Sequence, residues 1–437
     1  MNSDFERYHR TIANIEPFSV YGRVSGMIGL MVEGRGSGNS IGEMCRIYPN
    51  GRDRAISAEV VGFKEDKVLL MPLDDLDGVG PGCRFLSTGK QSQVGVGANL
   101  LGRVIDGQGN PLDDGEPLEL DGVYPVYADP INPLGRARIT EPIDLGIRAM
   151  NALFGCGKGQ RMGIFSGSGV GKSVLLGMIA RNTKADVRVI GLIGERGREV
   201  REFIENNLGA EGLERSVVVA ATSDRHPLIR MRAAYVATAI AEYFRDQGKD
   251  VLLMVDSLTR FAMAQREVGL SVGEPPTTKG YTPSVFSLMP RLLERAGTIE
   301  GGGSITGLYT VLVEGDDFNE PVSDTARSHL DGHIALSRDL AAKNHYPAID
   351  VLDSISRLMI DIVDSKQRER ANDILDIVAT YRKAEDLINI GAYVEGSSPD
   401  IDRAIGMIDR VNAFLRQDMA DKIDFETSRR DLFALFE

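Results

Sequence analysis

The chain has 437 residues and a formal net charge of -13, with 42% hydrophobic and 26% charged residues. This length suits two or three domains, and the composition is that of a folded globular protein rather than a disordered one. The acidic balance disfavours a nucleic-acid-binding protein. The three cysteines are widely spaced, which indicates neither a disulfide framework nor a zinc site. With a polar N-terminus and no apolar run near the roughly 18 residues of a membrane span, the sequence predicts a cytoplasmic protein of a reducing compartment.

The first 92 residues predict a helix and a small β domain. Residues 1–15 carry apolar side chains three and four positions apart, as on one face of a helix that packs on its own domain or docks on a partner or membrane surface. Residues 16–92 are short β-rich runs separated by turn clusters, which predict a β-barrel or sandwich. Between Glu16 and Gln91, nine basic residues face ten acidic ones, a balance of 9 − 10 = −1, and aromatic residues are few. A barrel that reads RNA would be more basic and more aromatic.

Residues 93–365 predict an α/β domain. A strand and tight turn over residues 101–111 leave the barrel, and a proline-punctuated connector follows. Near-continuous Val/Ile/Leu runs then alternate with helical patterns, which favours a parallel sheet covered by helices on both faces. These runs are residues 162–165, 187–193, 216–220 and 251–255. From residue 366 to residue 437 the periodicity is helical, so a small helical domain is expected to close the chain.

A glycine-rich loop lies between the first of these strands and a helix. Residues 166–173 read Ser-Gly-Ser-Gly-Val-Gly-Lys-Ser. Glycines let backbone N–H groups turn toward a phosphate, and the following helix adds the positive end of its dipole. Lys172 can reach the β- and γ-phosphates, and Ser173 can ligate Mg²⁺. The loop therefore predicts a nucleoside-triphosphate site whose binding residues are Gly167, Ser168, Gly169, Val170, Gly171, Lys172, Ser173 and Val174.

Two features near this loop need separate interpretation. The usual pattern G-x-x-x-x-G-K-[S/T] asks for glycine where this chain has Ser166. Residues 155–159, Gly-Cys-Gly-Lys-Gly, carry a second Gly-Lys pair without a following hydroxyl or helix, and we expect a turn there.

Carboxylates follow two of the expected strands. Asp256 ends the run 251–255, where a nucleotide-binding enzyme needs a carboxylate for the Mg²⁺ shell. The strand that ends at Ile193 continues into Gly-Glu-Arg-Gly-Arg-Glu. A carboxylate here can polarise the water that attacks the γ-phosphorus, and an adjacent arginine can stabilise charge. Glu195 is the preferred base, but composition alone leaves Glu199 open.

Longer motifs resemble a known family over nearly the whole chain. They are residues 101–104, 167–173, 191–200, 256–260 and 347–357. With these motifs the chain resembles the hexameric ATPases related to the catalytic subunit of rotary ATP synthases, and most of all the type III protein-export ATPases. Export ATPases share the missing first glycine at Ser166, and residues 280–286 and 292–297 point the same way. The longest acidic run after Lys366 is Glu385-Asp386, whereas the synthase subunit has a longer one.

The resemblance implies a fold and residue roles. It implies a RecA-like P-loop ATPase core between an N-terminal β-barrel and a C-terminal helical domain, with ATP and Mg²⁺ bound. Glu195 would be the catalytic carboxylate and Lys172 the phosphate lysine, with Ser173 and Asp256 at the magnesium positions. Arg196 would contact the γ-phosphate, and Tyr346 would pack on adenine. Arg357, which no physical pattern singles out, would be an arginine finger that reaches the nucleotide of the neighbouring subunit in a homohexamer.

The family resemblance also ranks the functions. It favours ATP hydrolysis that energises flagellar protein export, with the injectisome branch of type III secretion as the close alternative. An RNA-translocating hexamer of the terminator type and a non-catalytic ring subunit are remoter alternatives. The partners it implies are a stator-like regulator at the N-terminal helix, a central stalk protein, an export gate and chaperone–substrate complexes, at the inner face of the cell membrane and without nucleic acid.

Overall fold

The computed structural model describes residues 20–437, apart from residues 37, 52–53, 314, 316 and 319. The helix expected over residues 1–15 lies outside the described residues. The chain divides into two compact units, one of Met1–Ser92 with Leu270–Glu274, and one of Gln93–Gly269 with Pro275–Glu437. Within the part of the chain that the structure describes, no helix has the length and apolar composition needed to cross a bilayer.

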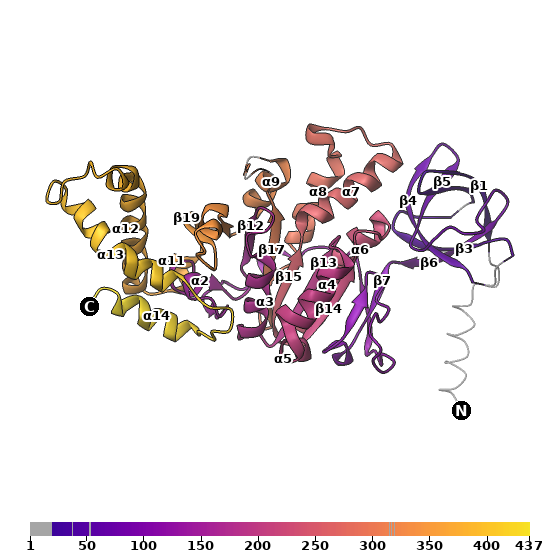
Figure 1. Cartoon of the computed structure of the whole chain (residues 1–437). Coiled ribbons are helices and arrows are strands. Elements are labelled where there is room, and N and C mark those ends of the chain that lie inside the picture. Colours follow the sequence, from indigo (N-terminus) through magenta and orange to yellow (C-terminus); the bar gives the residue numbers. More distant parts are fainter. Residues whose placement is uncertain (1–19, 37, 52–53, 314, 316, 319) are drawn as a thin grey trace, which may run out of the picture. The chain divides into compact units, whose positions relative to one another are not determined.

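The first unit holds a closed six-stranded antiparallel β-barrel (Figure 1). Its buried side chains alternate along the strands, so one face of each strand fills the barrel. At the start of the first strand, for example, residues 21 and 23 are exposed and residues 22 and 24 are buried. Gly22 and Gly34 make room for the ring of Phe85, because a Cβ atom at either glycine would lie 2.1 or 2.4 Å from a carbon of that ring. The barrel is confirmed, and the sandwich alternative is not. The strands, in barrel order, are β1 (Tyr21–Ile28), β2 (Met31–Arg35), β5 (Lys67–Pro72), β4 (Ile56–Lys64), β3 (Glu43–Tyr48) and β6 (Arg84–Gln91).

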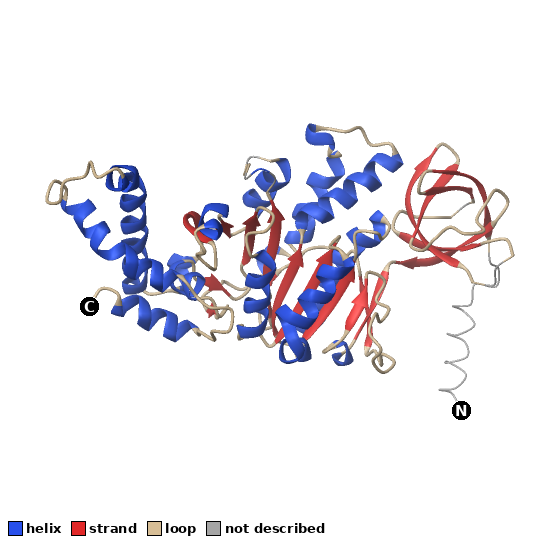
Figure 2. Cartoon of the chain, viewed as in Figure 1, coloured by secondary structure: helices blue, strands red, loops and turns tan. Residues whose placement is uncertain are grey.

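The second unit is built on a nine-stranded sheet, and Figure 2 shows its strands between helices. Along the strand order given below, each strand is parallel to its neighbour, except that the outermost strand β19 is antiparallel to β18. The path is β19 (Ile349–Ser356), β18 (Gly332–Leu336), β12 (Arg161–Ser166), β17 (Ser304–Leu312), β15 (Asp250–Asp256), β13 (Val187–Ile193), β14 (Ser216–Ala221) and β8 (Val104–Asp106), with β16 (Gly297–Thr298) paired to β17.

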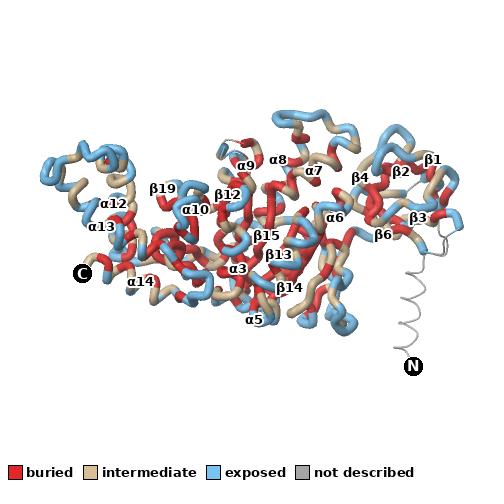
Figure 3. The backbone as a smooth tube through the Cα atoms, in the orientation of Figure 1, coloured by how far each residue is buried: buried red, intermediate tan, exposed pale blue. Residues whose placement is uncertain are grey.

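Both faces of this sheet are covered, which explains why its strands are apolar throughout. All seven residues of β13 are buried, and Figure 3 shows the central strands as buried. A Cβ atom at Gly191 would lie 3.3 Å from Ala237 of α6 (Pro227–Asp246), so that residue faces α6. Ile190 and Leu192 belong to the core cluster that also holds Leu176 of α3 (Lys172–Asn182). Successive residues of a strand point to opposite faces, so this alternation confirms the doubly covered parallel sheet.

The helices of the sheet lie between its strands in the sequence. They are α3 (Lys172–Asn182), α4 (Gly197–Glu202), α5 (Gly209–Glu214), α6 (Pro227–Asp246), α7 (Leu258–Val272), α8 (Pro283–Leu293), α9 (Pro321–His329) and α10 (Arg338–Ala342), with a π-helical turn η3 (Phe203–Leu208) and 3₁₀ turns η1 (Ala98–Leu100), η2 (Pro133–Gly135) and η4 (Thr278–Gly280). There are also two small two-stranded sheets in the described part of this unit. In one, β7 (Gln93–Val96) pairs with β9 (Gly122–Pro125), and in the other, β10 (Pro142–Ile143) pairs with β11 (Cys156–Gly157).

For two segments, the structure shows a position in the fold that the sequence did not predict. The expected strand over residues 101–111 is β8, which forms the edge of the parallel sheet beside β14. The second Gly-Lys pair turns at Lys158 and Gly159, directly after the short strand β11. Lys158 forms ion pairs with Glu141 at 3.0 Å and Asp250 at 2.9 Å, so its ammonium group is engaged in a structural contact.

The chain ends in helices, as predicted. They are α12 (Ser365–Asn389), α13 (Pro399–Leu415) and α14 (Phe425–Ala434), preceded by the short α11 (Met359–Ile362), and they pack with α2 (Arg148–Leu153). Asp364 caps α12 by accepting from the N–H of Gln367 at 2.8 Å, and Asp424 caps α14 in the same way. Gln417 donates to the carbonyl of Gly146 at 2.9 Å and accepts from the N–H of Arg148 at 2.8 Å, which joins the helices to the sheet domain.

Candidate active site

The glycine-rich loop joins the end of β12 to the first turn of α3. Gly169 and Gly171 have φ angles of 79° and 90°, in the left-handed region that favours glycine. Gly171 is the residue before α3, so the loop turns directly into the helix N-terminus. Ser166 is buried and forms the last residue of β12. The loop therefore has the strand–loop–helix context that phosphate binding requires.

A cavity of about 600 Å³ opens over this loop. Most of the expected nucleotide-binding residues line it, together with Glu195, Arg196 and Glu199. Val170 does not line it, because its side chain is buried in the core. The predicted residues that line the cavity are Gly167, Ser168, Gly169, Gly171, Lys172, Ser173, Val174, Glu195 and Arg196. A cavity of this size accommodates a small organic ligand.

Lys172 lies between the two carboxylates at the ends of neighbouring strands. Its ammonium group donates to Asp256 and lies 3.9 Å from an oxygen of Glu195. The same oxygen of Asp256 accepts from the hydroxyl of Thr310 at 2.7 Å. Lys172 lies in α3, Asp256 ends β15, and Glu195 is the second residue after β13. They meet because β12, β17, β15 and β13 are neighbouring parallel strands whose carboxyl ends lie at the same end of the sheet.

The two candidate bases have different environments. Burial and the nearby carboxylate of Asp256 raise the pKa of Glu195 to about 7, against the opposing charge of Lys172. A hydrogen bond from Glu195, together with Arg196, lowers the pKa of Glu199. A general base works best when its pKa lies near the operating pH. These environments favour Glu195 over Glu199 as the base.

The arginines of the cavity include two that sequence reasoning missed. Arg196 is 77% exposed and pairs with Glu199 at 3.2 Å, and both residues line the cavity. Arg260 and Arg338 also line the cavity. Arg260 lies four residues after Asp256 in the first turn of α7, close enough to Glu195 to lower the pKa of that carboxyl. Its place in the first turn of the helix that follows the strand end at Asp256 was a signal that could have identified it.

Tyr346 lies beside the phosphate loop. A Cβ atom at Gly171 would be 3.4 Å from a ring carbon of Tyr346, and the side chain is 42% exposed. An exposed aromatic ring next to a phosphate site can stack on a base, because every base offers a π-face.

Arg357 lies at the end of the sheet opposite the phosphate loop, where the parallel strands begin. Ser166 pairs with Leu336 at the loop end of β18, whereas Ser356 pairs with Gly332 at its opposite end. The five residues of β18 span roughly 13 Å at the usual rise of a strand. Arg357 is exposed, and it is not among the described residues that line the cavity.

The donors at the loop fit a magnesium ion that arrives with a nucleotide. In the described part of the chain, no group of three or more His, Cys, Asp or Glu side chains is arranged to hold a metal ion. The exposed Ser173 and the carboxylate of Asp256 carry oxygen atoms, which are the ligand type that Mg²⁺ takes. Mg²⁺ is commonly held by one or two protein oxygens plus substrate phosphates.

The fold and the loop define a P-loop nucleotide-binding protein with a barrel, a parallel-sheet core and a helical end. Residues 146–356 match the nucleotide-binding domain of the ATP synthase alpha/beta family, and residues 24–89 match its beta-barrel domain. Residues 363–434 match the T3SS EscN ATPase C-terminal domain.

Relatives of known name cover almost the whole chain. A flagellum-specific ATP synthase of Bacillus subtilis is 54% identical, over 92% of this chain and 92% of its own length. A type 3 secretion system ATPase of Xanthomonas euvesicatoria is 50% identical, over 93% of this chain and 92% of its own length. The solved structure of the assembled ATPase EscN from enteropathogenic E. coli has a TM-score of 0.90 and 45% identity, over 95% of this chain and 100% of that chain. A further structure shows EscN in complex with its central stalk EscO.

The chain belongs to the ATP synthase alpha/beta family, in the group that contains the flagellum-specific ATP synthases and the type III secretion ATPases. It is therefore an ATPase.

Proposed function

We propose that this chain hydrolyses ATP to energise export of flagellar proteins through a type III secretion apparatus, by delivering and unfolding substrates and their chaperones. The observation that carries this proposal is the contact of Lys172 with Asp256, close to Glu195, at the glycine-rich loop of a chain that is 54% identical to a flagellum-specific ATP synthase. An injectisome ATPase remains the alternative, supported by the relative from Xanthomonas euvesicatoria.

The chemistry we propose is in-line attack of water on the γ-phosphorus of ATP. Glu195, with a pKa of about 7, accepts a hydrogen bond from the water and so orients it. As the water oxygen bonds to the γ-phosphorus, Glu195 takes the proton of the water, and the bond from that phosphorus to the bridging oxygen breaks and releases ADP. Lys172 exchanges its contact with Asp256 for the β- and γ-phosphates, which brings its positive charge to the oxygens where negative charge gathers. Arg196 adds a contact to the γ-phosphate, and Tyr346 packs on adenine.

The magnesium proposal follows from the same residues. Ser173 and Asp256 would hold Mg²⁺, which neutralises charge on the phosphates when it is bound with ATP. The release of Asp256 by Lys172 on nucleotide binding frees the carboxylate for this task.

We propose that Arg357 completes the site of a neighbouring copy in a homohexamer. The register of β18 and β19 supports this role. It places Arg357 at the opposite end of the strands from the phosphate loop of its own chain, so the nucleotide that Arg357 reaches would be that of another copy. A closed ring of identical subunits gives each site one loop and one finger from different chains. An arginine finger contributes about 10³–10⁵ in rate.

The turn between α12 and α13 supports the proposal of a protein partner such as a stalk. Ile390 is 75% exposed and Val394 is 70% exposed, with Leu387 beside them at 48%. Three exposed apolar side chains within eight residues of one turn are a candidate interaction site. The other partners we propose are a stator-like regulator at residues 1–15, the export gate and chaperone–substrate complexes, in the cytoplasm at the inner face of the membrane and without nucleic acid.

Export of flagellar proteins into the medium tests this function. A strain that lacks the chain should lose export of flagellar subunits, and the wild-type chain should restore it while Glu195→Gln should not. Normal flagellar export in the deletion strain, with loss of secretion through an injectisome, would replace our proposal by the alternative.

A further inference from the structure

The end of β19 is held by a set of partly buried polar contacts that the proposed chemistry does not use. Arg357 directly follows this strand, and its backbone N–H donates to the carbonyl of Asp331 at 3.0 Å. The preceding residue, Ser356, donates its hydroxyl to the carbonyl of Gly155 at 2.8 Å. The side chain of Arg357 has one hydrogen bond in the described structure, a 3.3 Å contact to the carbonyl of Arg327. The backbone is therefore fixed while the guanidinium stays exposed.

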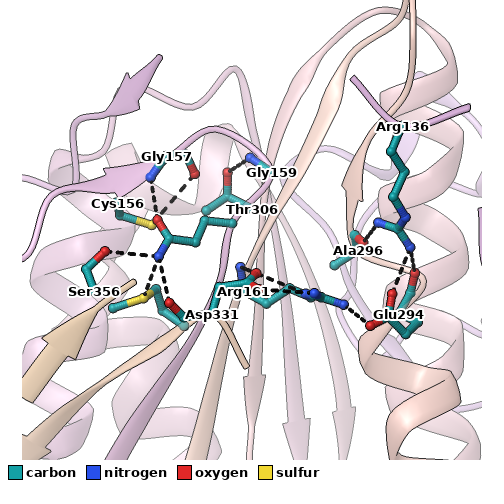
Figure 4. Close-up of polar contacts among 12 residues, drawn as sticks. Arg136, Cys156, Gly157, Gly159, Arg161, Glu294, Ala296, Thr306, Asp331 and Ser356 are labelled. Carbon is teal, nitrogen blue, oxygen red and sulfur yellow. Dashed lines mark hydrogen bonds and ion pairs between the residues drawn. The ribbon is translucent and has the colours of Figure 1, made fainter. Parts of the chain in front are cut away.

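Gln160 connects these two fixed points. Its side chain is fully buried, and its amide nitrogen donates to the carbonyl of Asp331 at 3.3 Å and to the hydroxyl of Ser356 at 3.1 Å. Its amide oxygen accepts from the N–H of Gly157 at 2.8 Å. The same carbonyl of Asp331 thus accepts from Gln160 and from Arg357. The contacts to Asp331, Ser356 and Gly157 are drawn in Figure 4.

Asp331 is in turn fixed to the start of β12. Its carboxylate accepts from the backbone N–H of Arg161 at 3.0 Å and from two nitrogens of the guanidinium at 3.1 Å each. Its own N–H donates to the carbonyl of Arg161 at 2.8 Å. Arg161 also pairs with Glu294 after α8, as Figure 4 shows. A bidentate guanidinium–carboxylate pair is geometrically specific, so it fixes the position of the Asp331 carbonyl as well.

The neighbouring strand comes unusually close at this point. A Cβ atom at Gly332 would lie 2.4 Å from the backbone oxygen of Ile355, so only glycine allows β18 and β19 to meet here. Gly332 and Ser356 are partners in the register of the two strands. The last residues of β19 are therefore placed by backbone packing on one side and by Gln160 on the other.

We propose that Gln160 is a positioning residue for Arg357, and that with Asp331 it sets where the guanidinium emerges toward the nucleotide of a neighbouring copy. This inference rests on the proposed role of Arg357 in a ring. Gln160 directly precedes β12, whose other end carries the phosphate loop of the same chain. A displacement of about 1 Å in a catalytic group can cost about 10² in rate.

A double-mutant cycle on ATP turnover in the assembled full-length protein tests the proposal. Gln160→Met keeps the length of the side chain and removes both hydrogen-bonding groups. We expect a fall in kcat of roughly 10- to 100-fold with KM for ATP little changed, because the phosphate loop is intact. If Gln160 acts through Arg357, Gln160→Met should lower kcat less than 2-fold in an Arg357→Ala background.

Gln367→Met is the matched control for loss of a buried glutamine amide. Gln367 is 1% exposed and donates to the carbonyls of Asn151 and Ala152 in the helical part of the same unit. Its effect on kcat should be the same with and without Arg357. Ser356→Ala should behave like Gln160→Met, whereas Ser356→Thr, which keeps a hydroxyl, should retain turnover. The serine pair also carries the test if Gln160→Met does not fold.

The outcomes separate this proposal from the proposed finger. If Arg357→Ala is slow and Gln160→Met and Ser356→Ala lower kcat by equal factors in both backgrounds, the positioning role is wrong and the finger stands. If Arg357→Ala turns over ATP at the wild-type rate, both proposals fail.

Discussion

Lys172 and Asp256 are 84 residues apart in the chain and joined by a hydrogen bond at the base of the phosphate loop. The pair forms because β12 and β15 both flank β17, which brings their carboxyl ends to one edge of the sheet. Asp256 is 4% exposed, so a partner for its charge matters.

Removal of Lys172 should abolish ATP binding. Lys172→Ala takes away the cation that neutralises the β- and γ-phosphates, so we expect affinity for a fluorescent ATP analogue to fall by more than about 100-fold. Lys158→Ala is a matched control from the second Gly-Lys pair, whose lysine contacts Glu141 and Asp250 instead. Equal loss of affinity in both variants would show that the effect is not specific to the loop.

Glu195→Gln should bind ATP and fail to turn it over. The amide keeps the shape of the side chain but cannot accept the proton of the attacking water. We expect kcat to fall by roughly 10²–10⁴ with unchanged affinity for the ATP analogue. Wild-type turnover in this variant would move the base to Glu199 or elsewhere.

The raised pKa of Glu195 predicts how the stability of the nucleotide-free protein depends on pH. The folded state binds this proton more tightly than the unfolded state, since the pKa rises from 4.5 to about 7. Glu195 therefore contributes stability that is fully present below pH 4.5 and is lost as the pH rises through about 7. We expect the Tm of Glu195→Gln minus that of wild type to increase between pH 5.5 and 8 by about 1–4 °C.

Glu202→Gln controls for the loss of a glutamate in the same segment, since this side chain is 53% exposed. A Tm difference for Glu195→Gln that stays constant over this pH range would contradict the assigned environment of Glu195.

Tyr346 should contribute to adenine binding through its ring. Tyr346→Ala removes a stacking surface worth about 1–3 kcal/mol per base, so we expect ATP to bind roughly 10- to 100-fold more weakly. Tyr346→Phe keeps the ring and should bind within about 2-fold of wild type. Equal affinity of the alanine variant and wild type would place adenine elsewhere.

Much of the fold could be predicted because the local patterns agree with it. The apolar runs at β13 and β15 read as buried parallel strands, and the short β-rich runs between turns in the first unit read as a barrel or sandwich. The position of β8 at the sheet edge could not be predicted, because strand order depends on contacts between distant segments. The domain boundaries at residues 15, 92 and 365 remain our proposal.

Some residues of the candidate site could be predicted from local sequence, and others could not. Lys172 and Ser173 belong to a local motif whose chemistry follows from adjacent residues. Arg357 carries no local signal, because its proposed role depends on a second copy of the chain. The choice between Glu195 and Glu199 needed burial and the neighbouring Asp256, which no spacing in the sequence reports.

Rings of mixed subunits test the shared site most directly. Lys172→Ala subunits keep their finger and lose their own site, whereas Arg357→Ala subunits keep their site and lose their finger. Each variant alone should be slower than wild type by about 10³ or more. In rings assembled from equal amounts, about a quarter of the sites should pair an intact loop with an intact finger, because each interface draws its two halves from different chains. We therefore predict that mixing restores ATP turnover to about a quarter of the wild-type rate. If mixed rings stay as slow as the separate variants, Arg357 does not act on the neighbouring subunit.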